Sequence, residues 1–402
     1  MSGIYQHAKE LDDSFHMHTY ARKPVMFVTG EGMRLYDDDG REYLDFVSGI
    51  GVINLGHSHP APVRAACEQM AKLTHVTNLY YVEHRSELAA DLVELFGGGA
   101  MAFFCNSGTE ATEGAIKLAR KWATEHKAAH ARTIVTAWHS FHGRTLAALA
   151  ATGQPSKQDA FKPLPAGFAH VPLNDIEALD AAVDENVCAV MLEPVQGEGG
   201  VHPCTPEYLA AVRALCDERG VLLILDEVQC GLYRTGYPFA HQGLGAKPDI
   251  MTLAKALANG LPIGAIIATD AVAASFGPGD HGSTFAGGPV VCAAARATLK
   301  AMVELDLGAR ALELGAYFAE SLSRIAQETG AISDIRSAGL MLAIDLVEPR
   351  AAQVAADLLA AGMLVNNIGT HTIRFLPPLV CTTLEIDTLC GHLHTILVKE
   401  PS

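Results

Sequence analysis

The sequence predicts an α/β protein with a mostly parallel sheet that helices cover on both faces. Between about residues 60 and 300, short apolar runs rich in β-branched residues alternate with longer helical segments, which is typical of a sheet buried between helices. After residue 301 the pattern changes to Ala/Leu-rich helix with two strand-like runs, and this indicates a second, smaller α+β domain. The chain of 402 residues is 49% hydrophobic and only 18% charged, so it can fill the core that such a fold requires.

The first part of the chain predicts a short amphipathic helix followed by a strand pair. Apolar residues alternate in the segment 20–46, and the turn sequence DDDG occupies residues 37–40. Three later segments have helical periodicity: 60–73, 84–96 and 109–127. Eight short apolar runs are expected to be strands: 101–105, 131–138, 187–195, 220–228, 249–255, 264–269, 339–347 and 371–379.

Composition argues against several classes of function. The formal net charge is −16, so no overall positive field would attract nucleic acid or anionic lipid. The nine cysteines are scattered and form no CxxC pair, which argues against a disulfide framework or a zinc site. The N-terminal stretch lacks the apolar core of a signal peptide, and no run approaches the roughly 20 apolar residues of a membrane span. We therefore expect a cytoplasmic protein that binds no nucleic acid, membrane or metal.

Two polar residues at strand ends indicate the chemistry. Asp226 closes the apolar run GVLLILDEVQ, and Lys255 closes the later run DIMTLAK. A carboxylate and a lysine at the ends of two buried strands can hold the two ends of pyridoxal 5′-phosphate (PLP). The carboxylate pairs with the protonated pyridine nitrogen, and the lysine bonds covalently to the aldehyde. This pairing predicts chemistry on amines.

The segment CNSGTEATEGAIKLAR (105–120) follows an apolar strand and opens a helix. Its first residues, Asn106, Ser107, Gly108 and Thr109, offer backbone N–H groups and hydroxyls at a helix N-terminus, where the helix dipole favours an anion. An ordinary N-cap is the alternative interpretation. The acid and the lysine described above favour a phosphate site.

Two loops carry further candidates. In the motif FHGRT, Phe141 can pack on a flat ring, and the planar guanidinium of Arg144 can bind a carboxylate. Core packing is the alternative for the phenylalanine. The glycine-rich loop EPVQGEGGV carries Glu193 and Glu198, and Glu198 is either a mobile gate or a solvated loop acid.

Three other features leave alternatives open. The segment GSTF (282–285) offers a second cluster of hydroxyls and glycine, but it is equally compatible with a turn. Arg374 lies in the apolar run IRFLPPL and needs a partner, either a substrate carboxylate or an internal acid. His57 and His59 have the spacing of metal ligands, but no acid or cysteine lies nearby, so helix-cap or core roles are expected.

The segments CNSGTE, FHGRT, EPVQGEGG, LLILDEVQCG, TLAKAL, GSTF and IRFLPPL occur in this order over about residues 20 to 380. Their order and spacing closely resemble those of the class III, fold-type I PLP-dependent aminotransferases, and most resemble the acetylornithine aminotransferases. The resemblance implies a large PLP-binding domain over 60–300 and a small domain built from both termini, 1–59 and 301–402. It also implies a homodimer with active sites at the subunit interface.

The resemblance further implies a role for each site residue. Lys255 would bind the cofactor and transfer the proton, and Asp226 would pair with the pyridinium. The other cofactor contacts would be Gln229 at the ring hydroxyl, Phe141 and Val228 on the two ring faces, Ser107, Gly108 and Thr109 at the phosphate, and Thr284 of the partner subunit. The substrate contacts would be Arg144, Glu198, Ser283 and Arg374.

Two arginines would bind the α-carboxylates of different substrates. Arg374 would hold the α-carboxylate of glutamate or 2-oxoglutarate, and Arg144 that of acetylornithine. Glu198 would pair with Arg374 and release it when glutamate binds. Without that pair, Arg374 would hold any α-carboxylate at the cofactor and misdirect the ω-amine substrate.

The implied reaction is transamination of N-acetylornithine with 2-oxoglutarate, giving N-acetylglutamate semialdehyde and glutamate in arginine biosynthesis. The alternatives are the same chemistry on ornithine, succinylornithine, succinyl-diaminopimelate or 4-aminobutyrate, another reaction type on this fold, and a non-catalytic PLP-fold binding protein. The sequence departs from the family pattern at Thr112, Tyr233 and Gly288. Tyr233, which we expect beside the substrate channel, bears on the choice of acyl group.

Overall fold

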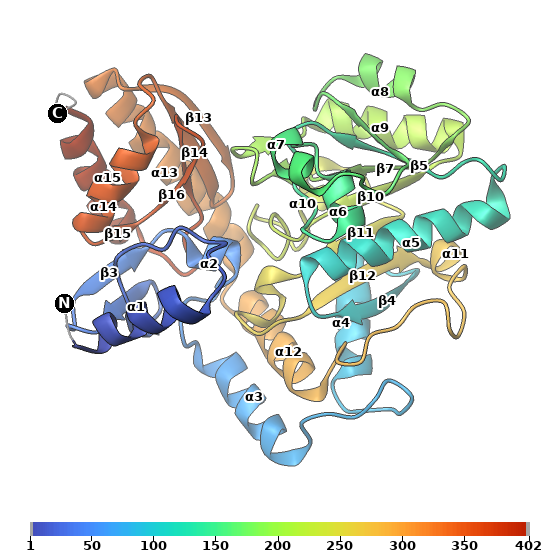
Figure 1. Ribbon diagram of the computed structural model, residues 1–402, viewed down its shortest axis with the longest axis horizontal. Coiled ribbons are helices and arrows are strands. Elements are labelled where there is room, and N and C mark those ends of the chain that lie inside the picture. Colours follow the sequence, from blue (N-terminus) through green and yellow to red (C-terminus); the bar gives the residue numbers. More distant parts are fainter. Residues whose placement is uncertain (1–2, 399–402) are drawn as a thin grey trace.

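The computed structural model describes residues 3–398 and divides the chain into two regions (Figure 1). The middle of the chain builds a large sheet with helices on both faces. The N-terminal and C-terminal segments together build the second region, on the left of Figure 1, where the blue and the orange-red ribbons lie beside each other. No helix within residues 3–398 is both long enough and apolar enough to cross a membrane.

The large sheet has seven strands in the order β4-β12-β11-β10-β7-β5-β6. Their bounds are β4 (Ala100–Cys105), β12 (Gly264–Thr269), β11 (Ile250–Leu253), β10 (Leu222–Asp226), β7 (Val187–Leu192), β5 (Thr133–Ala137) and β6 (Phe168–Val171). The neighbours from β11 to β6 pair in parallel, while β12 is antiparallel to both β11 and β4. The mostly parallel sheet expected from the sequence is therefore present, with one reversed strand.

Alternating residues of each central strand face opposite helix layers, because successive side chains of a strand point to opposite faces. Ile134 and Ile224 pack with the layer that contains α5. Their neighbours Val135 and Leu223 pack with the layer that contains α9. Both faces are thus apolar, which explains why these strands appear in the sequence as continuous hydrophobic runs rather than as an alternating pattern.

The helices of this region vary from single turns to five-turn elements. Their bounds are α3 (Pro60–Lys72), α4 (Arg85–Phe96), α5 (Gly108–His126), α6 (Leu146–Ala151), α7 (Pro155–Gln158), η1 (Asp159–Phe161), α8 (Ile176–Ala182), α9 (Pro206–Arg219), α10 (Ala240–Leu244), η2 (Lys255–Ala258), α11 (Asp270–Ala273) and α12 (Pro289–Glu304). The three helices expected at 60–73, 84–96 and 109–127 are α3, α4 and α5, within two residues at each end.

The second region contains two four-stranded sheets. Their strands are β1 (Phe27–Glu31), β2 (Arg34–Asp37), β3 (Glu42–Asp45) and β15 (Met363–Leu364) in one, and β13 (Ile332–Ala338), β14 (Met341–Leu346), β17 (Thr372–Phe375) and β16 (Asn366–Ile368) in the other. The helices are α1 (Gly3–Phe15), α2 (Ser48–Gly51), α13 (Leu307–Thr329), α14 (Ala351–Ala360) and α15 (Thr383–Val398). β3 pairs in parallel with β15, so the two ends of the chain share a sheet. The domain bounds 1–59, 60–300 and 301–402 stay a prediction.

Some turns and strands agree with the sequence-based predictions and others do not. The DDDG turn joins β2 to β3 and ends at Gly40, whose φ of 80° lies in the left-handed region that glycine tolerates. The run expected at 187–195 is broken, because β7 ends at Leu192 and Val195 begins the short ribbon β8 (Val195–Gln196), which pairs with β9 (His202–Pro203). The strands β6, β13 and β16 were not expected.

Candidate active site

A cavity of about 390 Å³ lies where the strands of the large sheet end. Parallel strands place their carboxyl ends at one edge, and the loops that follow them carry the candidate residues. Ten of the candidates line this cavity: Ser107, Gly108, Thr109, Phe141, Arg144, Glu198, Asp226, Val228, Gln229 and Lys255. Residues that lie far apart in the sequence are therefore brought together at the position where open α/β sheets bind ligands.

Asp226 ends β10 and is 4% exposed. One carboxylate oxygen accepts a hydrogen bond from His142 Nδ1 at 2.8 Å, and the other accepts from Thr252 Oγ1 and the Val228 amide, both at 3.1 Å. Burial disfavours protonation of His142, but the Asp226 carboxylate outweighs it and raises the pKa of the imidazole. Asp226 is thus held as a fixed, hydrogen-bonded carboxylate facing the cavity.

Lys255 follows β11 and begins the 3₁₀ helix η2 with a φ of 40°. This left-handed conformation is costly for a residue with a side chain, and here it occurs at the residue whose amine lines the cavity. Loss of hydration and the nearby Arg374 lower the pKa of Lys255 from 10.5 to about 8, although Glu198 opposes the shift. A lysine with such a pKa is uncharged in a useful fraction near neutral pH, as a base must be.

The N-terminus of α5 also lines the cavity. Ser107 is the N-cap and its Oγ accepts the Glu110 amide at 3.3 Å, so the ordinary capping role exists alongside the exposed N–H groups of the first turn. A Cβ at Gly108 would come within 2.9 Å of Val228 Cγ1, so only glycine fits there. The turn therefore combines a helix dipole with open backbone donors, as an anion site requires.

Arg374 lies in β17, in the second region, and is 1% exposed; it does not line the cavity itself but contacts Glu198 and Gln229, which do. Its Nη1 lies 2.7 Å from Glu198 Oε1 and 2.9 Å from the Gly197 carbonyl, while Nη2 donates to Asn366 Oδ1 at 2.6 Å. Burial opposes ionisation of Glu198, but Arg374 outweighs it and lowers the pKa of the carboxyl group. The expected Glu198–Arg374 ion pair is present.

Arg144 has a different environment. Its side chain is exposed, and the guanidinium lies over the Phe141 ring at 5.5 Å from the centroid. Phe141 lines the cavity rather than packing in the core. The site thus contains one buried, acid-paired arginine and one open arginine, on different elements.

Four other residues named from the sequence lie outside the cavity lining. Ser283 Oγ accepts a hydrogen bond from Asn106 Nδ2 at 2.9 Å, and Thr284 is exposed at the surface. Tyr233 is a correction: we expected it beside the channel, but its ring is buried in the apolar core and lies close to Gly308 of α13. Gly288 is the N-cap of α12.

Sequence reasoning missed three supporting groups, His142, Glu193 and Thr252. His142 directly follows Phe141 in the FHGRT motif, and Glu193 begins the EPVQ motif, so both were visible but received no role. Glu193 accepts hydrogen bonds from the Phe141 amide at 2.8 Å and the Gly197 amide at 3.2 Å. The available signal was the position of Glu193, a polar residue directly after a strand.

The two histidines with metal-like spacing have structural roles. His59 Nδ1 accepts the Ala61 amide at the start of α3, and His57 Nε2 lies 2.8 Å from Asp45 Oδ2. The expected cap role is confirmed for His59, whereas His57 is half-buried and contacts an acid twelve residues away in the sequence, which was not expected.

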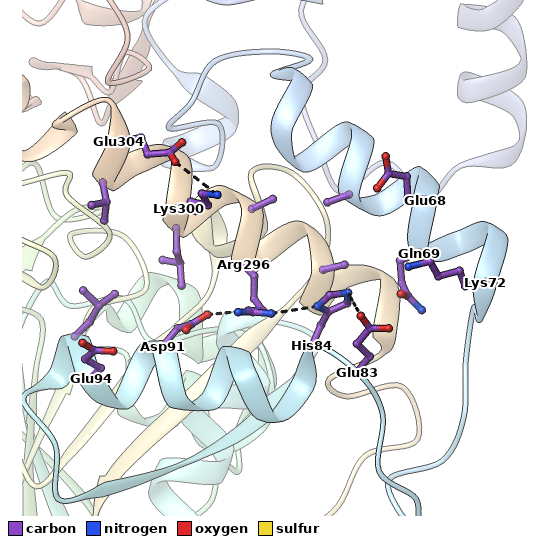
Figure 2. Close-up of a pocket in the computed structure, with 16 residues that line it drawn as sticks. Glu68, Gln69, Lys72, Glu83, His84, Asp91, Glu94, Arg296, Lys300 and Glu304 are labelled. Atoms are coloured by element: carbon purple, nitrogen blue, oxygen red, sulfur yellow. Dashed lines mark hydrogen bonds and ion pairs between the residues drawn. The ribbon is translucent and has the colours of Figure 1, made fainter.

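A larger cavity of about 800 Å³ lies between α3, α4 and α12, away from these residues (Figure 2). Its charged side chains largely satisfy one another: Arg296 bonds Asp91 at 2.9 Å and lies 3.3 Å from His84 Nδ1. None of the candidate residues lines it, so it is not part of the site.

Comparisons with known proteins agree with this geometry. Residues 16–397 match the family described as Aminotransferase class-III. The chain is similar to the acetylornithine aminotransferase of Caldanaerobacter subterraneus, with 49% identity over 95% of this chain and 96% of that protein. It is also similar to that of Methanocaldococcus jannaschii, with 45% identity over 97% and 98% of the two chains.

A solved structure shows the same fold. The crystal structure of the ornithine aminotransferase from Toxoplasma gondii superposes with a TM-score of 0.93, at 33% identity, over 98% of this chain and 95% of that one. The fold-type I architecture expected from the sequence is confirmed. From the family match and these similarities over nearly the full length, the chain belongs to the class III aminotransferases, enzymes that depend on pyridoxal 5′-phosphate.

Proposed function

We propose that this enzyme transfers the ω-amino group of N-acetylornithine to 2-oxoglutarate, giving N-acetylglutamate semialdehyde and glutamate. The observation that carries the proposal is the pair of arginines around Lys255: Arg374 is neutralised by Glu198, whereas Arg144 is open. An enzyme that must accept an ω-amine first and an α-amino acid second needs one carboxylate site that can be switched off. The names of the relatives above support N-acetylornithine as the amine donor.

The residues of the cavity fit PLP. The open N–H groups of the α5 N-terminus would bind its phosphate, and the fixed Asp226 carboxylate would pair with its ring nitrogen. We assign the remaining contacts to Phe141 and Val228 on the ring faces, Gln229 at the ring hydroxyl, and Ser107, Gly108 and Thr109 at the phosphate. When bound through Lys255, PLP supplies an electron sink for the bond that breaks at the amine-bearing carbon.

Asp226 and Lys255 would have different roles in the reaction. Asp226 would hold a proton on the ring nitrogen, because its buried carboxylate is fixed by hydrogen bonds from His142 and Thr252. Lys255 would be the base that takes the proton from the substrate carbon onto its Nζ and later gives it up. Its lowered pKa keeps part of the amine population uncharged near neutral pH.

The two carboxylate sites act in turn. In the first half-reaction Arg144 holds the α-carboxylate of acetylornithine, so that the distal amine reaches Lys255. Glu198 stays paired with Arg374 during this half-reaction. In the second half-reaction Glu198 swings away and Arg374 binds the α-carboxylate of 2-oxoglutarate. The 2.7 Å pair represents the first of these two arrangements.

One feature supports a homodimer with shared active sites. Large apolar side chains are exposed together on the loop before α4 and on the GSTF segment: Leu79, Tyr80, Tyr81 and Phe285. Such a patch is typical of a subunit interface. In the proposed dimer, Thr284 of the partner subunit completes the phosphate site, and Ser283 lies beside the substrate.

The nine cysteines are unpaired, which supports a reducing, cytoplasmic location.

The visible absorption of the PLP-loaded protein tests the proposal. Without any keto acid, addition of N-acetylornithine should convert the cofactor band, and later addition of 2-oxoglutarate should restore it with production of glutamate. Ornithine is the second candidate, since the similar solved structure is an ornithine aminotransferase. Conversion by ornithine or 4-aminobutyrate but not by N-acetylornithine would keep the chemistry and reject the substrate.

A further inference from the structure

Glu193 joins two loops of the active site through a single carboxylate. It directly follows β7, and its side chain is buried, with the residue 6% exposed. Oε1 accepts the Phe141 amide at 2.8 Å, and Oε2 accepts the Gly197 amide at 3.2 Å. Phe141 lies in the loop after β5, and Gly197 lies in the loop between β8 and β9. One side chain therefore bridges segments that are more than fifty residues apart in the chain.

Both bridged loops carry groups of the substrate site. The first contains the Phe141 ring, which lines the cavity, and the Arg144 guanidinium above it. The second, which we call the gate loop (residues 197–200), contains Glu198, and the Gly197 carbonyl accepts Arg374 Nη1 at 2.9 Å. The two amides that Glu193 accepts therefore belong to Gly197, one residue before Glu198, and to Phe141, three residues before Arg144.

The gate loop has little room to move as a whole. A Cβ at Gly197 would lie 1.7 Å from Gln229 Oε1, and one at Gly199 would lie 2.8 Å from the His139 carbonyl. Gln196 Nε2 also donates to the Trp138 carbonyl at 2.9 Å. The backbone at the start of this loop is therefore held at several points.

A carboxylate suits this bridge better than any other side chain. Both partners are backbone N–H donors, and an ionised carboxylate offers an acceptor to each. The isosteric amide has only one acceptor oxygen, and its NH₂ group would face the second N–H. Hydrogen bonds to a charged acceptor are also the stronger ones, so the bridge holds best when Glu193 is ionised.

We propose that Glu193 is a positioning residue that locks the Phe141 loop to the backbone of the gate loop, so that only the Glu198 side chain moves when the site changes substrate. The lock follows from the contacts of Glu193 alone. Its kinetic consequence rests on the function proposed above, because it assumes that Arg144 and Arg374 bind substrate carboxylates in turn.

The charges around Glu193 predict that the two hydrogen bonds it accepts depend on pH. Burial raises the pKa of Glu193 to about 7, His142 opposes the rise, and Asp226 adds to it. The titratable groups that face it are His142 after β5, Asp226 at the end of β10, Lys255 after β11, and the Cys204 and Cys230 thiols. Protonation of Glu193 below about pH 7 removes the charge that holds the two amides.

Amide hydrogen exchange of the cofactor-free protein tests the lock directly. Peptides that contain Phe141 and Gly197 are compared in the wild type, in Glu193→Gln and in Glu218→Gln, an exposed control in α9. We expect exchange at one or both of these amides to become about 10-fold faster or more in Glu193→Gln, and to be unchanged in the control. In the wild type, protection corrected for intrinsic exchange should fall as the pH drops through about 7, and in Glu193→Gln it should not.

A second variant covers the case in which Glu193→Gln does not fold. Glu193→Asp keeps the charge but is one methylene shorter, so it should release one amide and retain the pH dependence at the other. Kinetics add a readout: both viable variants should raise KM for the amine donor and for 2-oxoglutarate several-fold, with a smaller change in kcat. Unchanged exchange at both amides, or faster exchange spread evenly over the whole chain, would overturn the proposal. Exchange needs neither cofactor nor substrate, so its outcome is independent of the proposed reaction.

Discussion

The lowered pKa of Lys255 predicts that this lysine destabilises the cofactor-free protein. In the unfolded chain its pKa is 10.5, and in the fold it is about 8. A tenfold change in an ionisation constant is equivalent to about 1.36 kcal/mol, so below pH 8 the charged amine costs the fold up to about 3 kcal/mol. The side chain is partly accessible to solvent, so screening makes this an upper figure.

The sign of the pH dependence follows from proton binding. Between about pH 8 and 10.5 the unfolded chain keeps the proton that the folded chain has lost, so the stability of the wild type rises through this window. Lys255→Met removes the amine and keeps a flexible apolar side chain of similar length. The variant retains the left-handed backbone at this position, so backbone strain cancels in the comparison.

The assay is urea unfolding of the cofactor-free wild type, Lys255→Met and Lys300→Met between pH 6.5 and 10.5. Lys300 is a surface lysine whose side chain is 75% exposed, so its variant controls for general loss of a positive charge. Lys255→Met should be more stable than the wild type at pH 7, by about 1–3 kcal/mol, and the gain should shrink toward zero near pH 10.5. An equal gain at all pH values, or a less stable variant at pH 7, would refute the electrostatic reasoning.

The remaining predictions concern the site and its loops. Asp226→Ala should lose most of its turnover even with PLP bound, since loss of a buried charge partner costs about 3–5 kcal/mol; near-normal turnover would remove Asp226 from its role. Glu198→Gln should erode the discrimination between ω-amine and α-amino-acid donors in half-reaction assays, because Arg374 is then no longer neutralised, and unchanged selectivity would reject the gate. Gly197→Ala places a Cβ against Gln229 and should displace the gate loop, raising KM for 2-oxoglutarate; an unchanged KM would show that the loop adapts.

The sequence alone was sufficient for the class of fold and for the anchor residues of the site. Continuous apolar runs predict buried parallel strands, because a strand covered on both faces carries mostly apolar side chains. A polar residue that ends such a run is then conspicuous, as Asp226 and Lys255 are. Short motifs also fix local geometry, so the helix that begins at Gly108 and the turn that ends at Gly40 are recognisable from a few residues.

The strand order and the contacts between distant segments could not be read from these patterns. The parallel pairing of β3 with β15 joins the two ends of the chain, and β6 and β16 are too short to show a period. Tyr233 illustrates the limit: its place in the sequence suggested the channel, but packing against α13 puts its ring in the core.

The same limit applies to the supporting groups of the site. His142 meets Asp226 across 84 positions of the chain, and Arg374 meets Glu198 across 176. A hydrogen bond requires donor and acceptor within about 3 Å, and only the order of the strands and the packing of the two regions sets such distances. Sequence patterns therefore identified ten residues that line the cavity, whereas the tertiary structure decided which of them touch, because contacts between remote residues depend on packing and not on local periodicity.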